Sequence, residues 1–137
     1  MSDVIDLLEP SQDAVFVALA AAVPADLAKV FVVVPQDTAP NFIQIGALDS
    51  EPDTEIAEQL EKITVEVQYI YRGQDRSQLL RMMQAGRAAI DRKILPPQDG
   101  AEFGMAKCAG SSASTATGDG VTFAGIQNFV FWAQPTG

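Results

Sequence analysis

The chain has 137 residues, the usual length of one domain, and 47% of them are apolar, which suffices for one hydrophobic core. Eighteen acidic residues against nine basic ones give a net charge of −9, which disfavours general attraction to nucleic acid or to an anionic membrane. Histidine is absent and Cys108 is the one cysteine, which excludes the commonest general base, an internal disulfide and a multi-thiolate metal site. We therefore expect a protein that is not an enzyme.

The chain is predicted to form one domain over residues 1–137, with mobile ends at 1–9 and 134–137. Its first residues are acidic where a signal peptide is basic, and no apolar run reaches the roughly 20 residues of a membrane span. These features predict a soluble product made in the cytoplasm.

A first helix is predicted after Pro10. Ser11 is a candidate N-cap, and apolar residues recur at helical spacing from Val15 to Val23. Pro24 is expected to end this helix, because a proline cannot continue the backbone hydrogen bonding.

Two strands are predicted next. The run VFVVV at residues 30–34 is β-branched and aromatic, which indicates a short strand buried on both faces. A loop with two prolines follows. The segment NFIQIGAL at 41–48 then predicts a strand with Ile43 and Ile45 on one face.

A long polar connection is predicted over residues 49–61, before the clearest alternation in the sequence. From Lys62 to Arg72 the odd-numbered residues are apolar or aromatic, and most of the even-numbered ones are polar. This pattern is typical of an antiparallel strand with one buried face.

A second helix of about 20 residues is predicted from Asp75, its N-cap, to the prolines at 96 and 97. Its apolar stripe consists of Leu79, Leu80, Met83, Gly86, Ile90 and Ile94. Four arginines lie largely outside the stripe: Arg76, Arg81, Arg87 and Arg92. They predict a solvated or subunit-facing surface more than a nucleic-acid contact, because no aromatic residues interleave with them.

The last third of the sequence predicts a hairpin. Its first strand runs over 103–117, its turn is Gly118-Asp119-Gly120, and its second strand runs over 121–133. The second strand is apolar on both faces, with Phe123, Phe129 and Phe131 on one and Ile126, Val130 and Trp132 on the other. Helices on one side of the sheet cover only one of these sets, and a partner subunit is a candidate cover for the other.

The predicted elements follow the order α-β-β-β-α-β-β with antiparallel neighbours. The expected class is α+β, with a mostly antiparallel sheet of about five strands and two helices packed on one face.

The acidic run after the second strand is the main candidate for metal binding. Its members are Asp49, Glu51, Asp53 and Glu55. Their alternate spacing resembles a calcium loop, but Thr54 replaces the required glycine and Leu60 the required glutamate. A solvated acidic loop is the favoured interpretation. The triplet Asp37-Thr38-Ala39 resembles that of retroviral-type aspartic proteases, yet it does not directly follow an apolar strand and is interpreted as a turn. No metal or cofactor is expected.

The sequence resembles the tail-completion, or tail-terminator, proteins of long-tailed bacteriophages and phage-like particles. The best local match is PNFIQIG at residues 40–46, and the second is the alternating strand 63–71 followed at once by an arginine-bearing helix. With the N-terminal helix and the final hairpin, the resemblance covers most of the chain.

This resemblance implies a structural virion protein with the α+β fold and no catalytic residue. It implies a hexameric ring that caps the head-proximal end of the tail tube, stops tube polymerisation and joins the head connector. The implied partners are other copies of the chain, the tail tube protein, a connector or neck protein, and genomic DNA that passes through the lumen without specific binding. The implied location is the virion tail, after synthesis in the cytoplasm of a bacterial host.

The charge distribution suggests two competing roles for the acidic run. Residues 49–66 carry a net charge of −6 and residues 67–93 carry +4, so the acidic run of one subunit could face the basic helix of its neighbour. Alternatively, the same carboxylates could line the lumen and repel passing DNA. The alternative functions are another head-tail joining component, a tail tube subunit, or a small acidic ligand- or metal-binding module.

Overall fold

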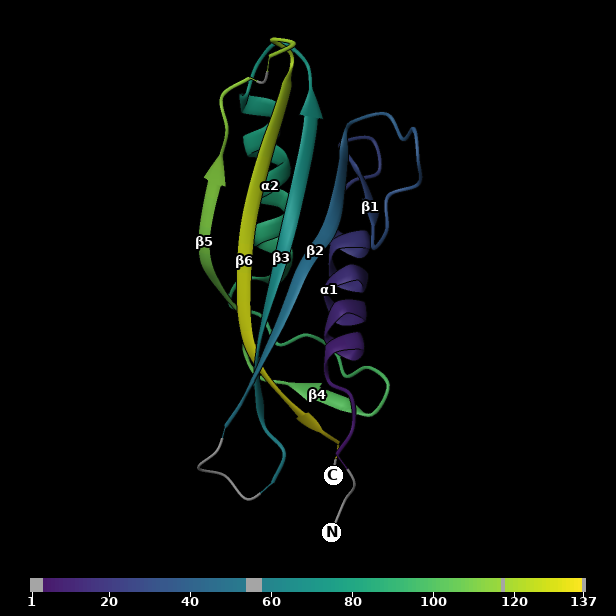
Figure 1. Ribbon diagram of the computed structural model, residues 1–137, viewed down its shortest axis with the longest axis vertical. Coiled ribbons are helices and arrows are strands. Elements are labelled where there is room, and N and C mark those ends of the chain that lie inside the picture. The colour runs from purple at the N-terminus through teal and green to yellow at the C-terminus, as the bar shows by residue number, and fades with distance from the viewer. Residues whose placement is uncertain (1–3, 54–57, 117, 137) are drawn as a thin grey trace.

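Two helices pack against one face of a curled sheet (Figure 1). The computed structural model describes residues 4–53, 58–116 and 118–136. The elements are α1 (Leu8–Ala22), β1 (Lys29–Phe31), β2 (Phe42–Pro52), β3 (Glu61–Arg72), α2 (Ser77–Ile90), β4 (Ala101–Phe103), β5 (Lys107–Ala113) and β6 (Thr122–Pro135). The predicted α+β class and the predicted order of elements are confirmed, with one short additional strand, β4, before the final hairpin.

The sheet is mixed, with the strand order β1-β2-β3-β6-β4, and β5 also pairs with β6. The pairs β2–β3, β3–β6, β4–β6 and β5–β6 are antiparallel. β1 runs parallel to β2, so the expectation of antiparallel neighbours is wrong at this edge. The reason is that the connection 32–41 returns the chain past β1 before β2 begins.

α1 begins at Leu8, before the predicted N-cap Ser11. The carboxylate of Asp6 caps this helix by accepting hydrogen bonds from the backbone N–H groups of Leu8 (2.9 Å) and Glu9 (3.2 Å). Ser11 is buried within the first turn instead, and its hydroxyl donates to the carbonyl oxygen of Leu7 at 2.6 Å. The helix ends at Ala22, just before the proline predicted to stop it.

β1 is a short edge strand, so the predicted strand over residues 30–34, buried on both faces, is wrong. Val33 lies beyond the end of β1 and is 80% exposed. The β-branched composition indicates an extended backbone, but it does not reveal whether a strand has neighbours on one side or on two.

β2 continues into the segment 49–61 that was predicted to be a polar connection. Ile43 and Ile45, which were predicted to share one face of this strand, are both buried. Between Ile45 and Leu48 the register with β3 shifts by a β-bulge. Beyond the bulge, Asp49 and Glu51 lie on the face of the sheet opposite the helices, because their partners on β3 are the outward-facing even-numbered residues.

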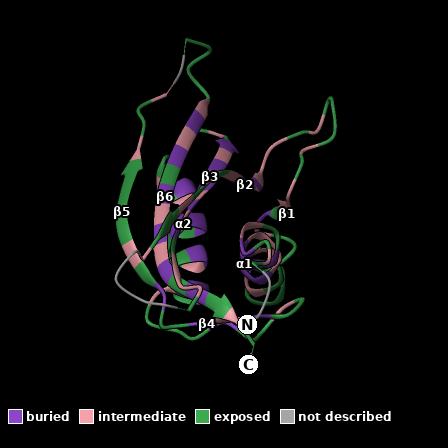
Figure 2. Ribbon diagram, turned by 60° about the horizontal axis from the view of Figure 1, so that its bottom comes forward, coloured by how far each residue is buried: buried purple, intermediate pink, exposed green. Residues whose placement is uncertain are grey.

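The centre of the core lies between the helices and the two longest strands. All odd-numbered residues of β3 from Ile63 to Tyr71 are buried, as are Phe123, Phe129 and Phe131 of β6, so both predicted alternations are confirmed. α1 contacts β1, β2 and β3, and α2 contacts β3, β5 and β6. Figure 2 colours the buried residues along these helices and strands.

α2 is shorter than predicted, because the chain turns directly after Ile90. Arg92 adopts a left-handed conformation (φ 64°), and its backbone N–H donates to the carbonyl oxygen of Ala106 at 2.8 Å. The helix therefore ends before the two prolines that were expected to stop it. The N-cap position is Arg76, one residue after the predicted Asp75, and its side chain makes no cap hydrogen bond. Oδ1 of Asp75 still accepts a hydrogen bond from the backbone N–H of Ser77, at 2.9 Å.

The buried stripe of α2 differs in part from the predicted one. Leu80 is 47% exposed and Ile94 is 65% exposed, whereas Met82 and Ala89 are buried. Ile94 lies beyond the end of the helix, so helical spacing no longer applies to it.

The final hairpin has a divided first strand. The strand predicted over residues 103–117 is broken after Phe103, where β4 ends, and resumes as β5 at Lys107. The turn at 118–120 is followed by β6, and Oδ1 of Asp119 accepts hydrogen bonds from the N–H groups of Val121 and Thr122, each at 3.0 Å.

Both ends of the described chain make specific contacts. Ile5 exchanges two hydrogen bonds with the side chain of Gln59, at 3.1 and 2.9 Å. The backbone N–H of Thr136 donates to the carbonyl oxygen of Gly100 at 2.8 Å. The remaining terminal residues, 1–3 and 137, lie outside the described residues.

Candidate assembly surfaces

No described helix or strand covers the face of the sheet opposite the helices, and we call it the open face. It consists of the even-numbered residues of β3 and β6 with the residues beside them on β2 and β5. The second apolar set predicted for the last strand lies here: Ile126 is 39% exposed, Trp132 is 43% exposed and Val130 is half-buried. Lys62 and Thr64 of β3 lie beside Trp132 and Val130, so polar side chains interrupt the apolar strip.

The acidic run is divided between a strand and the hairpin that follows it. Asp49 and Glu51 are exposed in β2. Asp53 follows the strand, and its backbone N–H donates to the carbonyl oxygen of Leu60 at 2.9 Å. Glu55 lies outside the described residues.

The four arginines surround α2 and do not form a single row. Arg81 is exposed on the helix itself. Arg76 directly precedes the helix, and its Nη1 donates to the carbonyl oxygen of Ser114 at 3.3 Å. Arg92 lies in the turn after the helix, and Arg87 lies in its last turn. All four side chains are exposed.

Asp91 connects the end of α2 to β5. Its Oδ1 accepts a hydrogen bond from the backbone N–H of Cys108 at 2.9 Å, and its Oδ2 accepts one from Nε of Arg87 at 3.0 Å. The Cys108 N–H, and after it the Arg87 guanidinium, hold the pKa of Asp91 below the usual carboxyl range. Arg87 is thus already paired within its own chain.

The elements that carry the acidic run and those that carry the arginines lie at opposite edges of the sheet (Figure 1). The edge formed by α1, β1 and β2 presents Glu9, Asp49 and Glu51, and also the basic Lys29 at the start of β1. The edge formed by α2 and β5 presents the four arginines together with Lys107. One chain therefore does not bring the acidic run and the basic helix together, and contact between them requires a second molecule.

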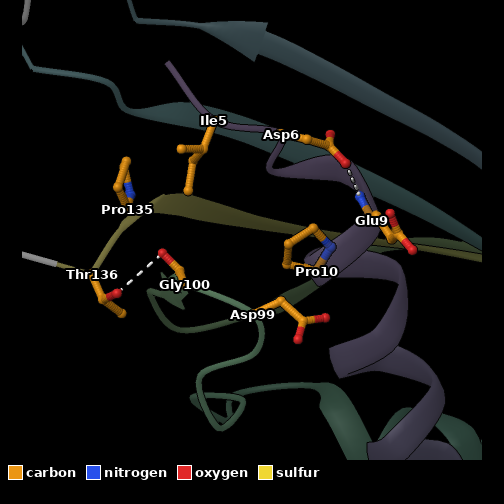
Figure 3. A pocket seen from close by; sticks show the side chains of 8 residues that line it. All are labelled: Ile5, Asp6, Glu9, Pro10, Asp99, Gly100, Pro135 and Thr136. Atoms are coloured by element: carbon orange, nitrogen blue, oxygen red, sulfur yellow. Dashed lines mark hydrogen bonds between the residues drawn. The ribbon is translucent and has the colours of Figure 1, made fainter. Parts of the chain in front are cut away.

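An open pocket of about 640 Å³ lies where the two ends of the chain meet (Figure 3). Its lining consists of Ile5, Asp6, Glu9, Pro10, Asp99, Gly100, Pro135 and Thr136. Part of the polar lining already serves local structure, because Asp6 caps α1 and the hydroxyl of Thr136 donates to the carbonyl oxygen of Gly100 at 3.2 Å.

The described residues also bear on metal binding and membrane insertion. No group of three or more histidine, cysteine, aspartate or glutamate side chains among them could hold a metal ion. No helix among them is long and apolar enough to cross a membrane.

Sequence reasoning missed the free edge of β5. The segment Ala109–Ala113 is mostly exposed, and it pairs with β6 on one side only among the described residues. The run of small residues at 109–113 indicated a strand with little to bury, but nothing in its pattern revealed that the strand lies at the edge of the sheet.

Comparison with known proteins places this fold. The sequence matches no family model and no curated protein. Among solved structures, a chain of the virion of a native gene transfer agent (GTA) particle aligns with a TM-score of 0.75 at 19% sequence identity. The alignment covers 94% of this chain and 96% of that chain. The class of protein is therefore an α+β domain whose fold is shared, almost from end to end, with that virion chain.

Proposed function

We propose that this chain is a structural virion protein of a phage-like particle, and specifically a tail terminator. In this role it forms a hexameric ring, caps the head-proximal end of the tail tube, stops its polymerisation and joins it to the head connector. The protein acts by binding and assembly, without catalysis.

The observation that carries the proposal is the end-to-end match with a chain of a gene transfer agent virion. A match over nearly the full length of both chains supports a common role more than a shared motif would. The sequence resemblance to tail terminators, noted above, makes the role more specific.

The surface supports assembly as well. Acidic and basic groups on opposite edges favour a head-to-tail contact between copies, which closes into a ring when the rotation between neighbours is a whole fraction of a turn. The acidic run retains its second candidate role, in which Asp49 and Glu51 line a lumen through which DNA passes.

Electron microscopy of the purified chain, alone and mixed with tail tubes, tests the proposal. We expect six-fold rings and tubes that are capped at one end and stop growing. Long tubes formed by this chain alone would instead assign it to the tube subunits, and binding to connectors without capping would assign it to the neck.

Charge reversal tests the ring contact. Replacing Arg81 and Arg87 by glutamate should weaken ring formation at low salt, because exposed charges are least screened there. Rings that form as readily as those of the unmodified chain would refute a contact based on these arginines.

A further inference from the structure

The two long edges of the sheet are both unpaired over part of their length. β1 covers β2 only from Phe42 to Gln44, and no described strand pairs with the following part of β2 on this side; we call Ile45–Glu51 the β2 edge. At the opposite side of the sheet we call Ala109–Ala113 the β5 edge. Unpaired strand edges of this kind are templates for pairing with another chain.

The turn after α2 defines where the β5 edge begins. The backbone N–H of Arg92 donates to the carbonyl oxygen of Ala106, and the N–H of Ala106 donates to that of Lys93, each at 2.8 Å. Asp91 accepts the outward N–H of Cys108. The start of β5 is therefore occupied within the chain, whereas the β5 edge is exposed, carries no charged side chain and contains no proline.

Strand direction allows the two edges to join. β2 and β6 run one way, and β3 and β5 run the other. When a second copy is placed beside the first in the same orientation, its β5 lies antiparallel to β2. The joined sheet then continues from copy to copy, and its strands keep alternating in direction across the joint.

Charge favours the same arrangement. The copy that presents its β2 edge also presents the acidic residues of α1 and β2, including Glu9, Asp49 and Glu51. The copy that presents its β5 edge also presents Arg81 and the other basic groups around α2. Asp49 and Glu51 lie on the open face, as does Lys107, whose partner on β6 is Val130. Glu9 lies on α1 and the arginines lie around α2, both on the helix side. Opposite charges of two copies therefore share each face of the joined sheet, and two identical edges would bring mainly like charges together.

In a closed sheet, neighbouring copies are offset along the strand direction, and this offset can bring the β5 edge of one copy level with the β2 edge of the next. In one chain the β5 edge lies level with residues 43–47 of β2, part of which β1 covers. Strands in closed sheets tilt by about 35–45°, so a unit four strands wide is offset by roughly four to six residues from its neighbour. An offset in one sense moves the β5 edge onto residues 48–52, which are the second half of the β2 edge and Pro52 directly after it. The opposite sense brings the β5 edge against β1.

We infer that neighbouring copies join head to tail, with the β5 edge of one copy adding as a strand to the β2 edge of the next. This inference rests on the proposed ring and specifies its joint. The interface is heterologous, so each copy uses both edges and the chain of contacts closes on itself.

Proline substitution tests the joint without disturbing the sheet of the single chain. The N–H of Ser114 donates to the carbonyl oxygen of Ala124 in β6. By alternation the N–H of Ser112 also points to β6 and that of Ser111 points outward. Ser111→Pro should leave the thermal unfolding temperature close to that of the control Ser111→Ala, because proline is tolerated where the N–H faces solvent. It should weaken self-association about tenfold or more in sedimentation experiments. Equal association of the two variants would overturn the inference.

Cysteine cross-linking identifies the neighbours directly. In a Cys108→Ala background, Ser112→Cys chains mixed with Asp49→Cys chains should form disulfide dimers, because cross-strand neighbours have Cβ atoms about 4.5–5.5 Å apart. Asn128→Cys, in the middle of the open face, should not cross-link to Asp49→Cys. Cross-linking of Asp49→Cys to Asn128→Cys, or of Ser112→Cys chains to each other, would overturn the joint.

These results are separable from the proposed function. If rings cap tail tubes but the Ser111→Pro chain assembles normally and the expected cross-link is absent, the joint is wrong and the function stands. If the cross-link forms but tubes are never capped, the joint stands and the function is wrong.

Discussion

At the scale of single residues, a buried hydrogen-bond chain fixes α2 against the sheet. The hydroxyl of Tyr69 donates to Oε1 of Gln127, and Nε2 of Gln127 donates to the carbonyl oxygen of Met83 at 3.0 Å. Burial raises the pKa of Tyr69 far above its ordinary value, so the phenol stays neutral and remains a donor. The Tyr69 hydroxyl occupies the space that a side chain at Gly86 would need.

This packing predicts the effect of Gly86→Ala. Although alanine favours the helix, the added methyl group collides with the Tyr69 ring, and we expect a loss of about 1–3 kcal/mol in unfolding free energy. In a Tyr69→Phe background the same change should cost less, because the hydroxyl is gone. Urea unfolding of the four variants gives the interaction energy, and additive effects would contradict this explanation.

Asp91 predicts a pH dependence. Its pKa is lowered in the folded chain, so its contribution to stability is present above the ordinary carboxyl range and is lost as the pH falls through its lowered value. Asp91→Asn should therefore be less stable than the unmodified chain at pH 7, and the difference should shrink between roughly pH 5 and pH 2. Thermal unfolding across this range measures it. Asp26→Asn, an exposed carboxylate after α1, controls for the loss of one negative charge.

At the scale of elements, neighbouring residues of β6 separate folding from assembly. Phe131 is 1% exposed, and Phe131→Ala should cost about 3–5 kcal/mol. Trp132 is 43% exposed on the open face, and Trp132→Ala should cost about 1 kcal/mol or less. Chemical denaturation of both variants tests the assignment of the two faces, and equal losses would contradict it.

Alternation in the sequence predicted the faces of β3 and β6, because a strand with one buried face imposes a strict period of two on its residues. The same reasoning failed where long-range contacts decide the structure. β1 is short because it lies at an edge, and α2 ends early because Arg92 bonds to Ala106, which is far along the chain.

The candidate assembly surfaces, like the fold, were predicted only in part from the sequence. Ile126, Val130 and Trp132 share one open face as predicted, whereas the acidic run proved to be partly a strand. The β5 edge was missed because the residues of an edge strand do not differ in pattern from those of a paired one. Its interface role, like that of the arginines, stays a prediction.

At the scale of the whole molecule, the single tryptophan of the sequence reports on how copies meet. A joint through sheet edges leaves the open face in water, and Trp132 lies on that face beside Lys62. We therefore expect the wavelength of its fluorescence emission to stay nearly constant when rings form. A pronounced blue shift would mean that copies pack through their open faces. The Trp132→Phe chain gives the background emission without tryptophan.

The bulge in β2 has a consequence for tracing the ancestry of this chain. It reverses which residues face the helices: before it the odd-numbered Ile45 does so, and beyond it Leu48 takes that side while Asp49 and Glu51 turn outward. A relative that lacks the extra residue would need its carboxylates at even-numbered positions to keep the same surface. A sequence alignment without a gap at 46–47 would pair Asp49 and Glu51 with core residues of such a relative. The two sequences would then look unrelated even though their backbones share one fold.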